Sequence, residues 1–224
     1  MSVCATLPFP VPHSRPTGSW CTCVPTRRAP VTDNGYSVVP LPNAAAAELH
    51  RDHYRKGTSI PYVSHLLGVA SLALEHGADR DEAIAALLHD AQEDRGGSKT
   101  TDTIAIVFGD RVADTVRGCS DSKESEQKDP WKTRKEAYLN HLETANQSVR
   151  LVSACDKLHN ARAILSDLRT HGDDLWDRFT GQKEGTLWYY RSLVGEFKDG
   201  GPEKVADELG RVVAEIERLA STGG

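Results

Sequence analysis

The sequence predicts an all-α fold. From Asn43 onward, apolar residues recur at the three-to-four-residue spacing of amphipathic helices, and glycine or proline separates the periodic stretches. No segment alternates polar and apolar residues for long enough to indicate a strand. A chain of 224 residues has the length for one domain with a sizeable core, and hardly for two.

The composition indicates a globular protein without a general affinity for nucleic acid or membranes. The net charge of −5 means that an anionic ligand would be held locally, by a metal ion or by a few basic side chains. No apolar run approaches the roughly 18 residues of a membrane span, and prolines interrupt the one stretch that resembles a signal peptide. The five cysteines are an odd number, which argues against a disulfide framework and favours a cytoplasmic location.

Residues 1–42 differ in kind from the rest of the chain. They contain eight of the eleven prolines and show no apolar periodicity. Because such sequence buries little, we expect a flexible tail over 1–42 and the folded domain over 43–221. Cys21 and Cys23 could form half of a metal site, but no partner pair follows, so we interpret them as incidental thiols.

The expected helices follow one another with short breaks. Asn43 is suited to cap the first, Pro61 to occupy the first turn of the second, and Gly77 to end that helix. Residues 120–129 are polar and are expected to form a loop. We expect helices at about 43–56, 61–76, 81–94, 103–108, 111–119, 130–145, 148–168, 184–197 and 202–219.

The helix expected at 81–94 carries an imidazole and three carboxylates together. At about 100° per residue, they share an arc of roughly 140°, opposite the apolar residues of the helix: His89, Asp90, Glu93 and Asp94. Acids at a helix C-terminus oppose the helix dipole. A bound cation would offset that repulsion, although a solvated acidic face would show the same pattern.

The helix expected at 148–168 offers a further carboxylate. Asp156 has apolar neighbours around much of the helix, so it is expected to face the interior, where an unpaired carboxylate is costly. Asn160, four residues on, shares its face. His159 points elsewhere, and we expect it to support or pack rather than to bind. His65, taken alone on its apolar helix, would be an ordinary core histidine.

The case for a metal rests on the whole set. Two imidazoles and two aspartates from three helices suit a divalent ion such as manganese, iron, zinc or magnesium, and not a closed structural zinc site. Arg55 and Lys56, ahead of the His65 helix, are placed to attract a phosphate to such an acidic site. Ordinary charges at a helix end are the alternative for this pair.

The order His65, His89-Asp90, Asp156 resembles the H…HD…D pattern of the HD phosphohydrolase superfamily. Over roughly Leu49 to Phe197 the chain is similar to the hydrolase domain of Rel/SpoT-type enzymes and to small alarmone hydrolases. Further matching blocks carry this resemblance: Arg55-Lys56, Pro61-Tyr62-Val63-Ser64-His65, Leu87-Leu88-His89-Asp90-x-x-Glu93-Asp94, Phe108-Gly109 and Asp156-Lys157-Leu158-His159-Asn160-x-Arg162.

The resemblance implies an HD-type helical bundle that removes the 3′-pyrophosphate from guanosine tetra- or pentaphosphate, usually with manganese. A companion synthetase domain is not expected in 224 residues. The roles implied are metal ligation by His65, His89, Asp90 and Asp156, orientation or deprotonation of water by Glu93 and Asp94, and nucleotide contact by Arg55, Lys56 and Asn160.

Two segments depart from the family's pattern, at 118–131 and at 185–190, and both are expected to help shape the pocket. The chemistry is therefore better indicated than the substrate. The alternatives are a phosphohydrolase for another nucleotide, such as a nucleoside monophosphate or the 2′-phosphate of NADPH, and a non-catalytic nucleotide-binding module. The sequence does not indicate an oligomeric state.

Overall fold

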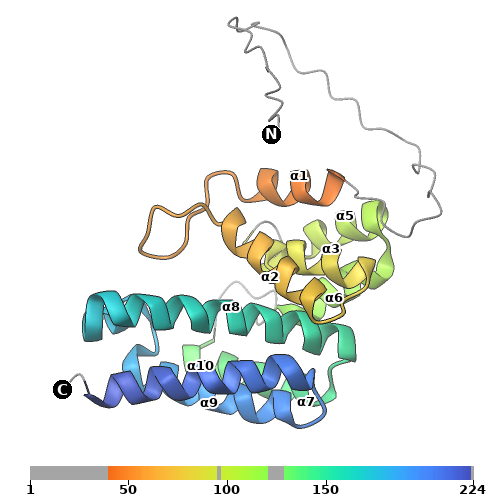
Figure 1. Ribbon diagram of the computed structural model, residues 1–224. Helices are drawn as coiled ribbons and strands as arrows, with labels where there is room; N and C mark the ends of the chain where they lie inside the picture. The colour runs from red at the N-terminus through yellow and green to blue at the C-terminus, as the bar shows by residue number, and fades with distance from the viewer. Residues whose placement is uncertain (1–39, 95–96, 121–128, 223–224) are drawn as a thin grey trace, which may run out of the picture. The chain divides into compact units, whose positions relative to one another are not determined.

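The computed structural model describes residues 40–94, 97–120 and 129–222, and in this part of the chain the regular structure is helical (Figure 1). The only strand-like pairing among these residues is an isolated bridge between Tyr54 and Pro61. The all-α prediction is therefore confirmed. The predictions for Cys21 and Cys23 and for the proline-rich tail lie outside the described residues, apart from residues 40–42, which belong to the first helix.

Ten α-helices and one 3₁₀ segment occur in the described residues. The α-helices from α6 onward begin and end within a few residues of the predicted positions, whereas the 3₁₀ segment was not predicted. The elements are α1 Pro40–Leu49, α2 Val63–Glu75, α3 Arg80–Leu88, α4 Ala91–Asp94, α5 Ser98–Phe108, α6 Asp110–Cys119, α7 Trp131–Thr144, α8 Gln147–His171, η1 Gly172–Arg178, α9 Gln182–Lys198 and α10 Glu203–Thr222.

The first helix was predicted too long. It ends at Leu49 instead of near Lys56, and residues 54–61 turn back on themselves. The Arg55 N–H donates to the Ile60 carbonyl (2.9 Å) and the Tyr62 N–H to the His53 carbonyl (2.8 Å), while Gly57 takes a positive φ of 72°. Beyond Leu49 the sequence has no apolar stripe to pack, so nothing holds the helix together.

The helix predicted at 81–94 is interrupted. A capping box of Asp79 and Glu82 starts α3, which ends at Leu88, and α4 begins at Ala91. His89 Nδ1 lies 2.8 Å from the Ala86 carbonyl oxygen, the acceptor that the Asp90 N–H would use in a continuous helix. This competition gives a physical reason for the break at the residues of chemical interest.

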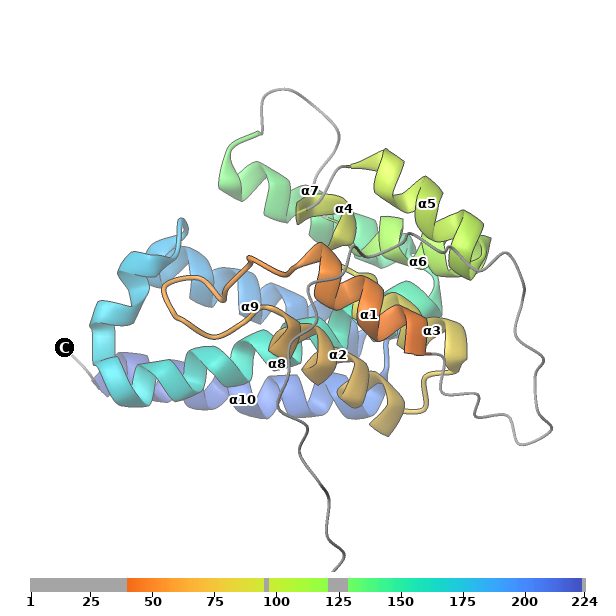
Figure 2. The same ribbon diagram turned by 90° about the horizontal axis from the view of Figure 1, so that it is seen from above.

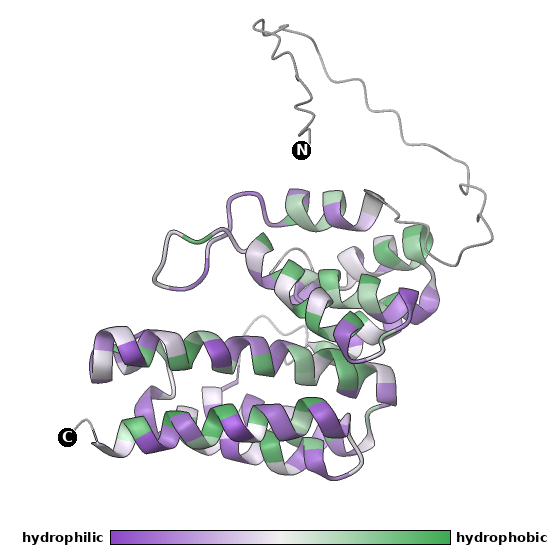
Figure 3. Cartoon of the chain, in the orientation of Figure 1, coloured by the Kyte–Doolittle hydropathy of each residue, from purple (hydrophilic) through white to green (hydrophobic). Residues whose placement is uncertain are grey.

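Helix α8 runs through the middle of the bundle, with α10 along one side and α2 along the other (Figures 1 and 2). Apolar residues recur along the helices between polar ones (Figure 3), and those that face inward form one core. Its fully buried members include Leu66, Leu88, Leu158, Leu193 and Leu209. None of the described helices is both long and apolar enough to span a membrane.

Candidate metal centre

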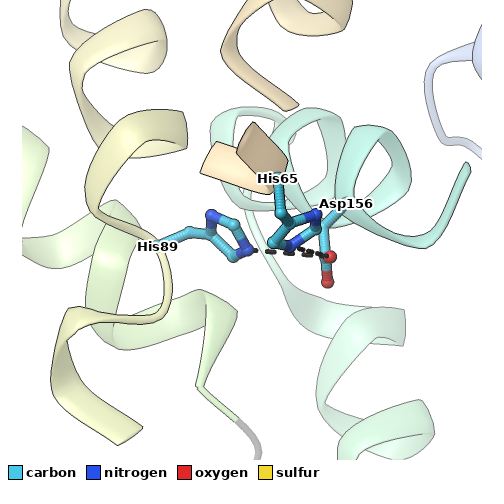
Figure 4. Close-up of side chains that lie close together, drawn as sticks. All are labelled: His65, His89 and Asp156. Atoms are coloured by element: carbon cyan, nitrogen blue, oxygen red, sulfur yellow. Dashed lines mark ion pairs between the residues drawn. The ribbon is translucent and has the colours of Figure 1, made fainter. Parts of the chain in front are cut away.

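The four predicted ligands come together where α2, the junction of α3 and α4, and α8 meet. His65, His89 and Asp156 point toward one another from three separate segments (Figure 4). One ligand atom from each of these three residues lies within 4.8 Å of the other two, and all three side chains are buried. Residues 24 to 91 positions apart in the sequence are thus brought to one point, as the prediction required.

The distances suit donor atoms around a shared ion. Asp156 Oδ1 lies 3.2 Å from His65 Nε2 and 3.6 Å from His89 Nε2. Asp90 Oδ2 lies 3.0 Å from His89 Nε2 and 3.6 Å from His65 Nε2, so the fourth predicted ligand belongs to the same cluster. Ligands bound at about 2.0–2.2 Å to one metal are separated by comparable distances.

His89 is oriented by its own helix. Its Nδ1–H donates to the Ala86 carbonyl at 2.8 Å, which leaves the lone pair on Nε2. That Nε2 atom is buried, and although Asp90 Oδ2 lies 3.0 Å away, no described residue meets it in hydrogen-bond geometry. A buried nitrogen without a hydrogen bond is costly, and a metal would satisfy it. The residues present therefore fit a divalent ion.

His65 is oriented from behind by His159. The two Nδ1 atoms are 2.9 Å apart, so a proton on one nitrogen is shared with the other. Burial, followed by the neighbouring His65 and Arg55, lowers the pKa of His159 to about 4, so this imidazole is neutral near pH 7. A Cβ at Gly68 would lie 2.4 Å from His159 Nε2, so glycine at this position leaves the ring its space. His159 thus lies behind His65, which is a predicted ligand.

The two carboxylates are held ionised. Asp156 accepts from Asn160 Nδ2 and Lys157 Nζ, both at 2.6 Å. Burial alone would raise the pKa of Asp156, but Lys157, His65 and His89 outweigh it and hold this pKa well below the usual range. Burial is likewise outweighed at Asp90, where His89 and His65 lower the pKa. The Tyr62 hydroxyl donates to Asp90 Oδ2 at 2.5 Å.

The carboxylates raise the pKa of His89 well above its usual value, although burial alone would lower it. A cluster without metal therefore retains a proton on His89, in competition with a metal ion.

Glu93 and Asp94 lie on α4, directly after Asp90. Glu93 is exposed, and its Oε1 accepts a hydrogen bond from Ser120 Oγ at 3.2 Å. The side chain of Asp94 lies outside the described residues. The role of this pair in activating water thus stays a prediction.

A cavity of about 400 Å³ borders the cluster. Three of its lining residues bond directly to predicted ligands: Tyr62 to Asp90, and Lys157 and Asn160 to Asp156. Arg55 and Lys56, for which substrate contact was predicted, also line it, but they reach it from the loop at 54–61 and not from a helix end. The alternative that they are helix-end charges is therefore wrong.

The cavity is electropositive. Five cations line it, whereas Asp167 is the only acidic residue among its described lining residues and pairs with Arg178 at 3.1 Å. Lys135 and Arg178 were not predicted from the sequence, and a lysine or arginine on a polar helix face gives no signal that it borders a cavity. The lining cations are Arg55, Lys56, Lys135, Lys157 and Arg178.

A family model described as an HD domain matches residues 43–187. The chain belongs to the HD domain family. This membership confirms the resemblance seen in the sequence and places His65, His89, Asp90 and Asp156 within the matched region.

Known proteins extend this result. The guanosine-3′,5′-bis(diphosphate) 3′-pyrophosphohydrolase MESH1 of Xenopus tropicalis is 37% identical over 122 residues, which are 53% of this chain and 65% of the relative. The chain thus matches less than two thirds of that relative's length.

Two solved structures share the fold. The structure of lmo0812 from Listeria monocytogenes EGD-e has a TM-score of 0.60 at 28% identity, over 69% of this chain and 99% of that one. A metazoan SpoT orthologue that hydrolyses ppGpp has a TM-score of 0.65, over 80% of this chain and 94% of that one. At 24% identity, the second likeness concerns the fold alone.

Proposed function

We propose that this HD domain chain is a divalent-metal-dependent phosphohydrolase that removes the 3′-pyrophosphate of guanosine-3′,5′-bis(diphosphate). The observation that carries the proposal is the cluster of two histidines and two aspartates that borders an electropositive cavity. The choice of substrate is supported by the relative from Xenopus tropicalis, whose name states this activity.

His65, His89, Asp90 and Asp156 would hold the metal. Mixed nitrogen and oxygen ligands suit manganese, which the family resemblance favours, and they suit magnesium, iron or zinc as well. When bound, the ion lowers the pKa of a water molecule and polarises a phosphoryl oxygen. Asn160 and Lys157 fix both oxygens of Asp156, so this carboxylate is ready to bind without rearrangement.

The remaining residues would position water and substrate. Glu93, with Asp94, takes a proton from the attacking water, whose oxygen bonds to the phosphorus attached to O3′ of the ribose. The bond from that phosphorus to O3′ breaks, O3′ takes up a proton, and pyrophosphate departs. Arg55, Lys56 and Asn160, which line the cavity, hold the phosphates and offset the charge of the departing group.

A cytoplasmic location and a phosphorylated nucleotide as the ligand belong to the same proposal. Cys119 and Cys155 are buried free thiols, which suits a reducing compartment. The cations are few and line a single cavity of about 400 Å³, which suits a small polyanion better than a nucleic acid.

The test is to identify the products. The full chain is incubated with guanosine-3′,5′-bis(diphosphate), with manganese or with a chelator, and the products are separated by anion exchange. We expect guanosine diphosphate and pyrophosphate, with no turnover in the chelator. Release of orthophosphate in place of pyrophosphate would contradict the proposal.

A substrate panel with NADPH and nucleoside monophosphates completes this test. Turnover of a panel member but not of the alarmone would indicate another nucleotide as substrate. No turnover of any compound would indicate a non-catalytic binding module.

A further inference from the structure

An aromatic wall completes the cavity beside the metal cluster. Trp131, at the start of α7, lines it together with Tyr189 and Tyr190 of α9. Tyr189 links the two regions: it lines the cavity together with Lys157, which donates to Asp156, and its ring centroid is 6.2 Å from that of Trp131. The indole therefore lines the same cavity as Lys157 and Asn160, which bond to the predicted ligand Asp156.

Two glycines of the α9 region fix the position of the indole. A Cβ at Gly181 would lie 2.6 Å from Trp131 Cη2 and 2.8 Å from Cζ2, and a Cβ at Gly185 would lie 3.1 Å from Cζ3. The rings of Trp188 and Tyr189 meet the indole at 68° and 74°. The six-membered ring of Trp131 is thus held between backbone and aromatic edges, in one orientation.

This arrangement matches the two parts of a nucleotide. Cations beside the metal ligands suit phosphates, and a fixed, partly exposed indole suits a flat heterocycle, because aromatic rings stack on one another. We propose that Trp131 is the platform on which the guanine base of the substrate stacks. This inference rests on the proposed function and makes Trp131 a specificity-determining residue of that reaction.

The test uses equilibrium binding and not turnover. Calorimetry with the full chain in manganese compares guanosine diphosphate, which has a base, with inorganic pyrophosphate, which has none. The variants are Trp131→Leu, Trp131→Phe and the control Trp188→Leu, because Trp188 contacts Trp131 but does not line the cavity.

We expect Trp131→Leu to raise the Kd of guanosine diphosphate at least about tenfold, which is about 1.4 kcal/mol. The Kd of pyrophosphate should change less than about twofold, and Trp131→Phe should lose less than leucine. Trp188→Leu removes only a neighbour of the indole, so it should weaken the binding of guanosine diphosphate less than Trp131→Leu does and should change the Kd of pyrophosphate less than about twofold. An equal loss for both ligands, or no loss for either, would overturn the proposal, as would failure of guanosine diphosphate to bind the parent chain.

Gly181→Ala tests the platform without removing it. Gly181 has an ordinary φ of −77°, so alanine fits the backbone, but its methyl group would push the indole aside. We expect Gly181→Ala to weaken the binding of guanosine diphosphate several-fold when it is made in the parent chain. The same change made in the Trp131→Leu variant should cause almost no further loss. Equal losses in both backgrounds would overturn the positioning by the glycine. If Trp131→Leu does not fold, Trp131→Phe and Gly181→Ala carry the test.

The outcome is separable from that of the proposed function. Selective loss of guanosine diphosphate binding in a chain that hydrolyses no alarmone would contradict the proposed reaction and support the stacking platform. Hydrolysis of the alarmone by the parent chain, with unchanged binding of guanosine diphosphate in Trp131→Leu, would support the proposed reaction and contradict the stacking platform.

Discussion

His159 supports His65 from behind, with 2.9 Å between their Nδ1 atoms. Because the low pKa of His159 makes it a neutral acceptor, the His65 Nδ1–H can donate to it, and the lone pair of His65 then lies on Nε2, toward Asp156. The pair therefore fixes both the tautomer and the direction of a predicted metal ligand.

We predict that His159→Leu lowers the affinity for manganese about 10- to 100-fold, because His65 loses the partner that orients it. Saturating metal should restore most of the turnover. Manganese titration of binding and of activity measures both effects. His171→Ala, a change at an exposed histidine at the end of the same helix, should leave the titration unchanged. An unaltered metal affinity in His159→Leu would assign His159 to packing alone.

The second prediction concerns metal content. We expect about one divalent ion per chain by elemental analysis, and its loss in His89→Ala and in Asp156→Ala. Affinity should fall as the pH falls, because the raised pKa of His89 means that a proton competes for the site. Asp156→Ala should also lower the Tm in metal, since Lys157 is left without its partner at 2.6 Å. Full occupancy in both variants would remove these residues from the ligand set.

Two of the four candidate ligands stood out against their local sequence, whereas His65 was singled out only as part of the set. Asp156 lies among apolar residues, and Asp90 belongs to a group of acids at a predicted helix end. Both arrangements are destabilising unless a cation lies nearby. The cavity wall was not predictable in the same way. Lys135 and Arg178 become lining residues only through the packing of α7 and η1, which no local pattern encodes.

The helices were predictable from periodicity, but two interruptions were not. The break after Leu88 follows from a bond of the His89 imidazole to a backbone carbonyl, and no glycine or proline marks it. The early end of α1 follows from the lack of apolar packing beyond Leu49, where helix propensity alone favoured continuation. The first difference thus comes from a local side-chain bond that competes with the helix, and the second from the absence of tertiary packing.

A third prediction separates metal binding from proton transfer. Glu93→Gln keeps the size of the side chain and an oxygen that accepts from Ser120, but it removes the base. We expect the metal to stay bound while turnover falls by at least about 10²-fold. Elemental analysis and steady-state kinetics on the same preparation measure the two properties. Activity within a few-fold of the parent would show that Glu93 is only a surface carboxylate.

The buried Arg150 gives a prediction of stability. Its guanidinium donates to the carbonyl oxygens of Leu142, Glu196 and Asp199, and so joins the ends of α7 and α9 to α8. Arg150→Met should lower the free energy of unfolding by about 1–3 kcal/mol, because it removes the hydrogen bonds of a buried, charged donor. Urea unfolding measures the change. Arg169→Met, at an exposed surface pair, should cost less than about 1 kcal/mol.

The last prediction concerns the charge of the substrate. If Arg55 and Lys56 hold the phosphates, the double change to alanine should raise KM more than it lowers kcat. The effect should increase with the number of phosphates, because each added charge meets the same two cations, and it should shrink at high salt to the extent that both side chains are exposed. Arg51→Ala, an exposed arginine outside the cavity, is the matched control.

A substrate with a single phosphate should scarcely respond to the double change. Steady-state kinetics with the alarmone and with a nucleoside monophosphate, each at low and high salt, supply the comparison. An equal loss for both substrates would mean that Arg55 and Lys56 shape the loop at 54–61 without holding the phosphate chain. That outcome would favour a simpler nucleotide over guanosine-3′,5′-bis(diphosphate) as the substrate.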